Sequence, residues 1–155
     1  MKHRIRAAGL LVQDNKLLLV KLEVDGKIFW VPPGGALEAC DNSTTDTVCR
    51  EVFEETGLKV TDVGPLVFVR EFNEPSRQTY HVEQFYLVMD WEGELTTENL
   101  RGLDDEHLIK EVAWLSQSQL ESVIVYPNSL RNEFWDKLGC AEIHATHLGV
   151  QVEGS

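Results

Sequence analysis

The sequence predicts a domain of the α/β (α+β) class, in which helices cover a mixed β-sheet. Three observations support this fold class: several short runs rich in β-branched and aromatic residues, an amphipathic helical segment in the first half of the chain, and two helical segments near its end. The 155 residues suffice for one domain with its own core, and no change in composition divides them. We expect a single domain over residues 1–139 and a tail, 140–155, whose order the sequence does not specify.

The first elements are expected to be strands. Two apolar runs flank the polar turn Gln13-Asp14-Asn15, which predicts a β-hairpin over residues 4–23. The basic and then apolar N-terminus resembles a signal peptide, but its apolar stretch is short and lacks a convincing cleavage site. We interpret it as the first strand of a cytoplasmic protein. A third strand is expected at 27–31, ending at Pro32-Pro33-Gly34-Gly35, where prolines remove amide donors and glycines permit positive φ.

A helix is predicted from about Thr44 to Thr56. Ser43 followed three residues later by Asp46 is a variant of the capping box, with an aspartate where glutamate or glutamine is usual. Gly57 supplies the C-terminal stop, and Leu58 can make the accompanying apolar contact.

The second half of the chain continues with strands and short helices. Residues 66–72 and 84–91 read as two strands joined by a polar loop, and residues 111–115 as another strand. Ser116 is a candidate cap for a short helix over 117–123, and a closing helix is expected at 128–139, ending at Gly139.

Charge and cysteine content exclude several classes of protein. The net charge of −12 repels nucleic-acid backbones, so we expect no nucleic-acid polymer as a partner. No apolar run approaches the roughly 18 residues of a membrane span, so no membrane partner is expected. Cys40, Cys49 and Cys140 are odd in number and widely spaced, which argues against a disulfide framework or a cysteine zinc site.

The helix at 44–56 carries an unusual group of acids. At roughly 100° per residue, Glu51, Glu54 and Glu55 fall within one arc that borders the apolar stripe of Val48 and Val52. Neighbouring like charges repel, and carboxylates are disfavoured near the C-terminal end of a helix dipole. One interpretation is a solvated acidic face. The other is a site for Mg²⁺, which prefers a few carboxylates together with substrate phosphates.

The segment "GGALEACDNSTTDTVCREVFEETGL", residues 34–58, resembles the Nudix box of the Nudix (MutT-like) hydrolases. That pattern is a glycine, five residues, a glutamate, seven residues and then R-E-U-x-E-E-x-G-U, where U is aliphatic. Its C-terminal half is present in full as Arg50 to Leu58, and "WVPPGG" resembles the usual entry into the box, which runs over about 35–58. From Gly35 to Arg50, however, there is one residue more than the pattern allows. The glutamate position therefore falls on Asp41 when counted from Gly35, or on Asn42 when counted from Arg50.

The resemblance implies a Nudix fold, with a mixed β-sheet between helices, and hydrolysis of a nucleoside diphosphate linked to another moiety. It implies that Glu51, Glu54 and Glu55 bind Mg²⁺ (or Mn²⁺) with the Gly35 carbonyl, and that Arg50 orients the carboxylates. It also implies a small-molecule nucleotide diphosphate partner, either ADP-ribose-like or a nucleoside triphosphate. Many members of the family are homodimers, although nothing in this sequence requires a dimer. A catalytically weak, nucleotide-sensing module is the alternative, which the altered N-terminal half of the box permits.

The residues that would activate water and recognise the substrate are less defined. Glu54 is one candidate general base, and Glu106 is another, in the acidic loop "LDDEH" together with Asp104 and Asp105. Trp30 is a candidate for stacking on a nucleobase, although aromatic residues at strand ends more often pack in a core. Arg70 and Arg77 are candidates to contact phosphate or adenine, and ordinary surface roles for both remain open.

Overall fold

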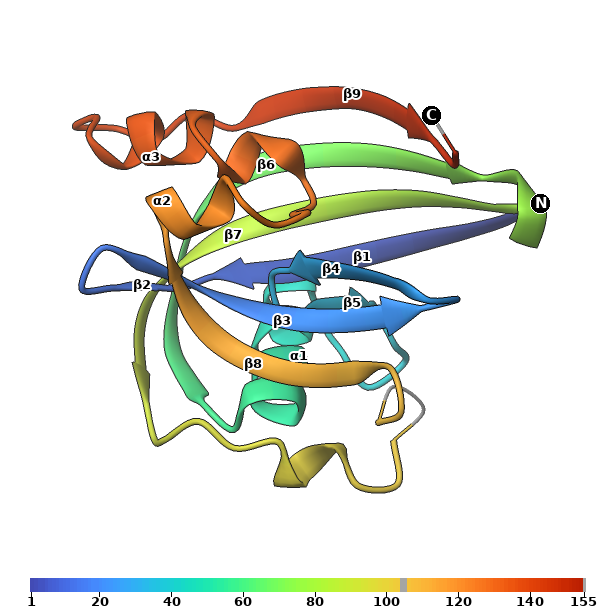
Figure 1. Ribbon diagram of the computed structural model, residues 1–155, viewed down its shortest axis with the longest axis horizontal. Coiled ribbons are helices and arrows are strands. Elements are labelled where there is room, and N and C mark those ends of the chain that lie inside the picture. The colour runs from blue at the N-terminus through green and yellow to red at the C-terminus, as the bar shows by residue number, and fades with distance from the viewer. Residues whose placement is uncertain (104–105, 155) are drawn as a thin grey trace.

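Across the residues that the computed structural model describes, 1–103 and 106–154, the chain forms two β-sheets (Figure 1). The larger sheet has the strand order β5-β1-β7-β6-β9 and is mixed, because β1–β7 and β6–β9 pair in parallel while β1–β5 and β6–β7 pair antiparallel. In the smaller, antiparallel sheet, β3 pairs with β2, β4 and β8. The strands are β1 (Lys2–Leu10), β2 (Val12–Gln13), β3 (Lys16–Val24), β4 (Lys27–Val31), β5 (Gly34–Ala36), β6 (Lys59–Glu74), β7 (Thr79–Glu92), β8 (Ile109–Ser116) and β9 (Thr146–Val152).

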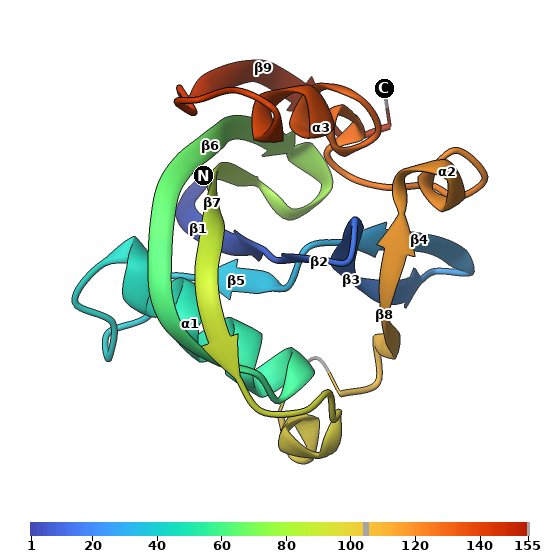
Figure 2. The ribbon, with the colours of Figure 1, turned by 90° about the vertical axis from the view of Figure 1, so that its left-hand side faces the viewer.

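Helical segments cover both faces of this β-layer, as predicted (Figure 2). They are α1 (Thr44–Thr56), η1 (Pro75–Arg77), η2 (Glu98–Leu100), α2 (Gln117–Leu120), η3 (Asn128–Leu130) and α3 (Glu133–Leu138). On one face, Val48 and Val52 of α1 pack in a cluster with apolar residues of both sheets. On the other, the second cluster contains Leu120, Leu130 and Phe134 from the segments after β8. The described residues therefore form two apolar cores, separated by the β-layer.

The predicted N-terminal hairpin is confirmed at its turn and wrong in its first strand. Asp14 and Asn15 have φ values of 52° and 59° and join β2 to β3, with Gln13 opposite Lys16. The first apolar run, however, divides at Leu11, and β1 pairs with β5 and β7 in the larger sheet. Residues 7–10 are buried on both faces of β1, which suits a central strand and not one arm of an exposed hairpin.

The later elements keep their predicted order but change in length. The strands expected at 66–72 and 84–91 are longer and form the β6–β7 hairpin, with η1 inside the expected loop. Ser116 caps α2 through a capping box with Gln119, and α2 is shorter than predicted. The expected closing helix is divided into η3 and α3, the second of which ends before Gly139.

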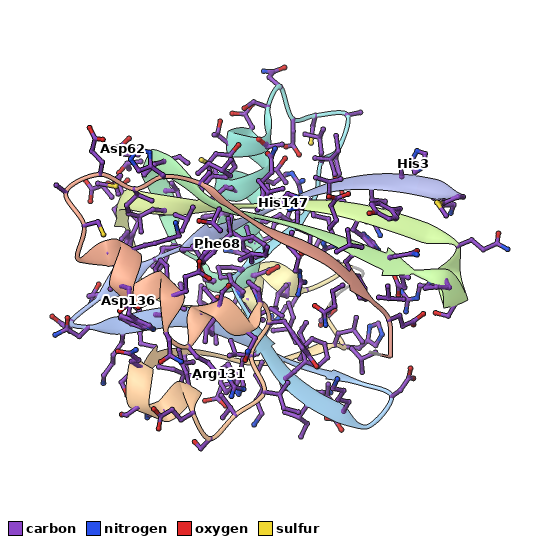
Figure 3. All side chains as sticks on the ribbon, turned by 90° about the horizontal axis from the view of Figure 1, so that it is seen from above. His3, Asp62, Phe68, Arg131, Asp136 and His147 are labelled. Carbon is purple, nitrogen blue, oxygen red and sulfur yellow. The ribbon has the colours of Figure 1, made fainter. Side chains whose placement is uncertain are left out.

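The segment after Gly139, for which no element was predicted, contributes the edge strand β9. It runs parallel to β6, from Thr146 opposite Phe68 to Val152 opposite Asn73. Figure 3 shows β9 from above, with His147 on it and Phe68 beneath. The Nε2 atom of His147 lies 2.8 Å from Oε2 of Glu71 and so ties β9 to the sheet. No helix in the described ranges is long and apolar enough to span a membrane.

Replacing Phe134 with alanine should lower the free energy of unfolding by about 3–5 kcal/mol, because this ring is fully buried in the core cluster under α3. Urea denaturation would measure the change. The matched control is Phe53→Ala on α1, where the ring is 47% exposed and the effect should stay within about 0.5 kcal/mol. Equal effects for the two variants would contradict the packing of the C-terminal segment.

Candidate functional site

Helix α1 forms where the sequence predicted it and buries part of its acidic arc. The Ser43 hydroxyl accepts a hydrogen bond from the Asp46 amide at 3.2 Å, and Gly57 adopts φ 80° while its amide donates to the Phe53 carbonyl. Of the three box glutamates, Glu51 and Glu55 are buried, at 7% and 5% exposure. A purely solvated acidic face is therefore excluded for these two residues, whose carboxylates lie between the helix and β5.

The glycine pair of β5 permits this close approach. A Cβ atom at Gly35 would overlap the Glu51 carboxylate, and one at Gly34 would lie 2.5 Å from the Ala7 carbonyl oxygen. The Gly34 amide also donates to Oε1 of Glu55 at 3.1 Å. Neither glycine has a positive φ. The requirement for glycine here is therefore space for the helix carboxylates and for β1, and neither position uses the positive φ that glycine permits.

Arg50 links the loop after β5 to the glutamates of α1. Its Nε and Nη2 atoms donate to the two carboxylate oxygens of Asp41 at 3.0 and 2.8 Å, and Nη2 also donates to the Ala36 carbonyl at 3.0 Å. Nη1 lies 3.0 Å from Oε1 of Glu51 and 3.5 Å from Oε1 of Glu54. Arg50 thus contacts two of the box glutamates, and the orienting role that the family resemblance implies for it stays a prediction.

Asp41, and not Asn42, is the residue at these two positions that contacts Arg50. Its side chain is 3% exposed and accepts further hydrogen bonds from the Glu38 amide and the Thr47 hydroxyl. Asn42 is exposed. Counting forward from Gly35 therefore finds the acid, and the extra residue falls between Asp41 and the helix. The sequence left both positions open because spacing alone does not show which side of the insertion keeps its register.

Asp41 and Glu51 both contact Arg50, but their pKa values are shifted in opposite directions. The hydrogen bond from Arg50 holds the pKa of Asp41 well below its ordinary value, and the same contact raises the pKa of Arg50. Burial, followed by the negative charge of Glu54, raises the pKa of Glu51. One guanidinium thus lies within ion-pair distance of four carboxylates, those of Glu38, Asp41, Glu51 and Glu54.

The donor atoms suit a hard divalent cation, although the site is not arranged around one. Within the described part of the chain, no three His, Cys, Asp or Glu side chains already converge to hold a metal ion. Glu51 and Glu54 instead share Nη1 of Arg50. Their oxygens are the ligand type that Mg²⁺ and Mn²⁺ prefer, and a cation beside Glu51 would oppose the effects of burial and of the Glu54 charge, which raise the pKa of Glu51. The residues present therefore fit such an ion.

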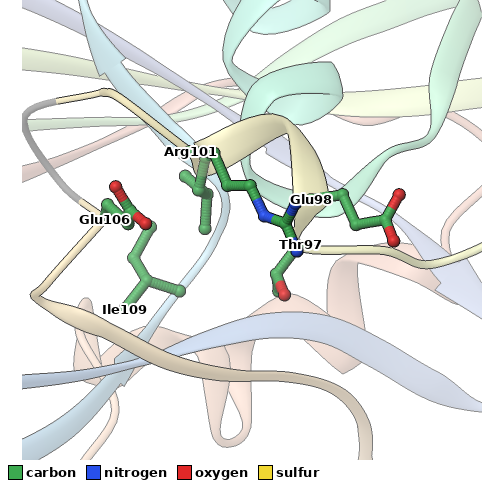
Figure 4. A pocket seen from close by; sticks show the side chains of 6 residues that line it. Thr97, Glu98, Arg101, Glu106 and Ile109 are labelled. Atoms are coloured by element: carbon green, nitrogen blue, oxygen red, sulfur yellow. The ribbon is translucent and has the colours of Figure 1, made fainter.

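Glu106 lies in a separate pocket of about 190 Å³ beside η2 (Figure 4). Its Oε2 accepts a hydrogen bond from the Gly102 amide at 2.9 Å. The side chain of Asn99 in η2 donates to the Phe53 carbonyl, so the loop lies against the last turn of α1. The pocket is lined by Thr97, Glu98, Leu100, Arg101, Glu106 and Ile109. Asp104 and Asp105, the other acids considered for this loop, lie outside the described residues.

Trp30 is a core residue, which corrects its assignment as a base-stacking side chain. It is 7% exposed and belongs to the cluster that contains Phe68 and Phe134. Its backbone is also fixed, because its amide donates to the Ile124 carbonyl and its carbonyl accepts from the Tyr126 amide. Almost none of the ring surface is left for a nucleobase.

The two candidate arginines lie in different places. Arg77 is 70% exposed in the β6–β7 turn and pairs with Glu74. Thr79, two residues after Arg77, pairs with Lys2 of β1. Lys2 lies five residues before Ala7, the partner of Gly35, which is a separation of about 16 Å along the strand. Arg77 therefore lies well along the sheet from the box glycines, and its contact with phosphate or adenine stays a prediction. Arg70 is 14% exposed and its Nη2 binds Oε1 of Glu83 at 2.8 Å.

A polar row on the larger sheet was not anticipated. Arg70 pairs across the strands with Glu83, Glu83 with Arg6, and Arg6 with Ala36, which follows Gly35. Oε2 of Glu83 also lies 3.9 Å from Nε of Arg6. The alternation of charged and apolar residues in β1 is the sequence signal, but only the strand order shows that the three residues are neighbours.

Comparisons with known proteins agree with this architecture. A profile of the NUDIX domain matches residues 2–135. The chain is 33% identical over 69 residues to Phosphatase NudJ of Escherichia coli strain K12, over 44% of this chain and 42% of that protein. The chain thus aligns with less than half the length of the curated relatives it matches.

Solved structures resemble it in fold. A MutT NUDIX hydrolase from Burkholderia pseudomallei superposes with a TM-score of 0.69 at 20% identity, covering 86% of this chain and 98% of that one. The E. coli ORF135 protein gives a TM-score of 0.69 at 21% identity, covering 90% and 93%.

Replacing Asp41 with asparagine should lower the free energy of unfolding by about 2–3 kcal/mol at pH 7, because Arg50 loses a buried, charged partner. The ionised form of Asp41 stabilises the fold above its unfolded pKa, about 3.9, and this contribution is lost as pH falls towards the lower folded pKa. The difference from wild type should therefore persist from pH 7 to pH 5 and shrink only below about pH 4.

Chemical denaturation at several pH values measures this difference. Asp62→Asn, at an exposed position on β6, is the control and should be neutral. An Asp41→Asn variant as stable as wild type at pH 7 would contradict the role given to this pair.

Proposed function

The chain belongs to the NUDIX domain family, and from that premise we propose that it is a Mg²⁺- or Mn²⁺-dependent hydrolase that cleaves the diphosphate linkage of a nucleoside diphosphate derivative. The observation that carries the proposal is the placement of three glutamates on one helix: Glu51 and Glu54 share Arg50, and Glu51 and Glu55 are buried against Gly35 and Gly34. Holding acids in this way is costly for a fold unless they serve a charged ligand.

In the proposed site, Glu51, Glu54 and Glu55 would hold the cation together with the Gly35 carbonyl. The bound ion would neutralise diphosphate oxygens and lower the pKa of a bound water. Arg50 keeps the glutamates in position from the side of Asp41, which is the supporting role that outer residues play at metal sites. Gly35 keeps the space beside Glu51 free of a side chain.

A general base would take the proton from the attacking water. Glu54 is a candidate because it is the most exposed of the three box glutamates, with 29% of its side chain accessible. Glu106 is the second candidate, in the loop that packs against the last turn of α1. Its carboxylate already has one oxygen fixed by the Gly102 amide, which leaves the other to act.

The proposal specifies the substrate only as a class. An ADP-ribose-like compound or a nucleoside triphosphate is the class that the box favours, and a curated relative is named a phosphatase. The sensing module was considered because the N-terminal half of the box is altered. The bidentate contact of Asp41 with Arg50 weakens that argument, because Arg50 keeps a carboxylate partner before the helix despite the added residue.

Turnover of a nucleotide panel tests the function directly. The panel would contain nucleoside triphosphates, ADP-ribose, NADH, dinucleoside polyphosphates and nucleotide sugars, each with Mg²⁺, with Mn²⁺ and with EDTA. We expect release of phosphate or nucleotide from one class, and its loss with EDTA. Nucleotide binding without turnover would instead support the sensing module.

Glu55→Gln should abolish metal-dependent turnover and leave the fold intact. The amide oxygen can still accept the Gly34 hydrogen bond, whereas the negative charge that binds a cation is removed. Initial rates and a melting temperature measure the two effects, and Glu121→Gln at an exposed position is the control. Wild-type activity in Glu55→Gln would refute the metal site.

Glu106→Gln distinguishes the two candidate bases. If Glu106 takes the proton, kcat should fall by about 10²–10⁴ and the acidic limb of the pH–rate profile should disappear. Glu98→Gln in the same pocket is the control and should keep the limb. Full activity in Glu106→Gln would assign the base to Glu54.

A further inference from the structure

An apolar strip crosses the smaller sheet from the Glu106 pocket to β4. It consists of Ile109 of β8, Leu22 of β3 and Phe29 of β4, because Ile109 pairs with Leu22 and Leu22 pairs with Phe29. Residues that pair across strands share a face of the sheet, so the three side chains form one row that spans about 10 Å. Ile109 also lines the pocket that contains Glu106 (Figure 4). The strip therefore begins beside a candidate general base.

The strip lies on the face of the smaller sheet that is turned toward α1. Leu22 follows Leu18 by four residues, and side chains alternate along a strand, so both point to the same face. Leu18 belongs to the core cluster that contains Val48 of α1. Trp30, next to Phe29, points to the opposite face and into the other core cluster. Phe29 is thus an aromatic side chain of β4 on the same side as the box helix.

The strip is apolar and remains partly accessible. All three of its side chains are half-buried, and among the described residues none of the three is a member of either core cluster. Single exposed apolar side chains are common, but ligand sites are lined mainly by contiguous apolar and aromatic residues with a few polar groups. A row of this kind, continuous with a polar pocket, suits a flat and largely apolar part of a ligand.

The Phe29 ring is ordered and has a hydrogen-bond donor beside it. Its centre lies 5.5 Å from that of the Tyr126 ring, in an edge-to-face arrangement. Nζ of Lys27 donates to the Tyr126 hydroxyl at 2.7 Å and lies 5.9 Å from the centre of the Phe29 ring. Lys27 forms no ion pair within the part of the chain that the structure describes, so further N–H groups of its ammonium can donate to a ligand. A nucleobase offers both a ring face for stacking and acceptor atoms along its edge.

The distance from the box also suits a nucleotide. Phe29 is five residues before Gly34, so the two backbone positions are at most about 18 Å apart. In a nucleoside diphosphate the ribose separates the base from the diphosphate. We propose that the strip binds the nucleobase of the substrate, stacked on Phe29, while the diphosphate lies at the box helix. The proposal rests on the proposed hydrolase function for its role in substrate choice, and on the strip itself for the binding of a base.

Base binding is tested without turnover and without metal. Adenosine and ribose, which carry no phosphate, are titrated in EDTA into the ¹⁵N-labelled full chain. We expect saturable shifts of the amides of Leu22, Phe29 and Ile109 with adenosine and none with ribose. Phe29→Leu keeps an apolar side chain but removes the ring, so adenosine should bind roughly tenfold more weakly.

Two further variants separate stacking from folding. Phe29→Tyr retains the ring and should bind adenosine like wild type. Ile28→Ala, at the neighbouring position on the opposite face with 47% exposure, is the matched control and should leave binding unchanged. Equal adenosine affinity in wild type and Phe29→Leu would overturn the proposal. Shifts of the strip amides that follow protein concentration alone would also overturn it and assign the strip to a second copy of the chain.

The role in substrate choice is tested with ADP-ribose and ATP, which both carry adenine. For the compound that is turned over, Phe29→Leu should raise KM roughly tenfold and change kcat little, because stacking on the base contributes equally to the ground state and the transition state. Adenosine binding at the strip without turnover of any compound in the nucleotide panel would refute the hydrolase and leave the strip standing. Turnover without adenosine-induced shifts would refute the strip alone. Adenosine binding with an unchanged KM in Phe29→Leu would overturn the substrate role and indicate a site for a free nucleoside.

Discussion

The guanidinium of Arg50 joins three parts of the chain that would otherwise repel or separate. It binds both oxygens of Asp41 in the loop before α1, the Ala36 carbonyl of β5, and Glu51 on the helix itself. Without this residue, several carboxylates would lie together in a partly buried region, which is strongly unfavourable. The Arg50 side chain therefore fixes the loop conformation, the approach of α1 to β5 and the orientation of the acids.

The two cores position this network without taking part in it. The cluster under α1 fixes the helix through Val48 and Val52, so that Glu51 and Glu55 face β5. The cluster on the other face fixes the C-terminal segments.

Local signals in the sequence were sufficient where an element depends mainly on its own residues. Helix α1 begins after Ser43 and ends before Gly57 because capping needs only residues nearby in the chain. Strand β5 was missed because Gly34-Gly35-Ala36 has low strand propensity and is extended only by pairing with β1. Strand β9 was missed because its periodicity is weak and β6 supplies its partner. Trp30 was misassigned because an aromatic residue at a strand end reads alike whether it is buried or exposed.

The sequence by itself determined the helix, its three glutamates, the arginine among them and the glycines before them, since all are set by spacing along one segment. Only the tertiary structure decided which acid pairs with Arg50, because the added residue before the helix shifts the register and a contact across the loop resolves it. It likewise decided which of Phe29 and Trp30 is turned toward α1, and that Arg77 lies far from the box. Such relations depend on strand order and packing, which bring together residues distant in the chain.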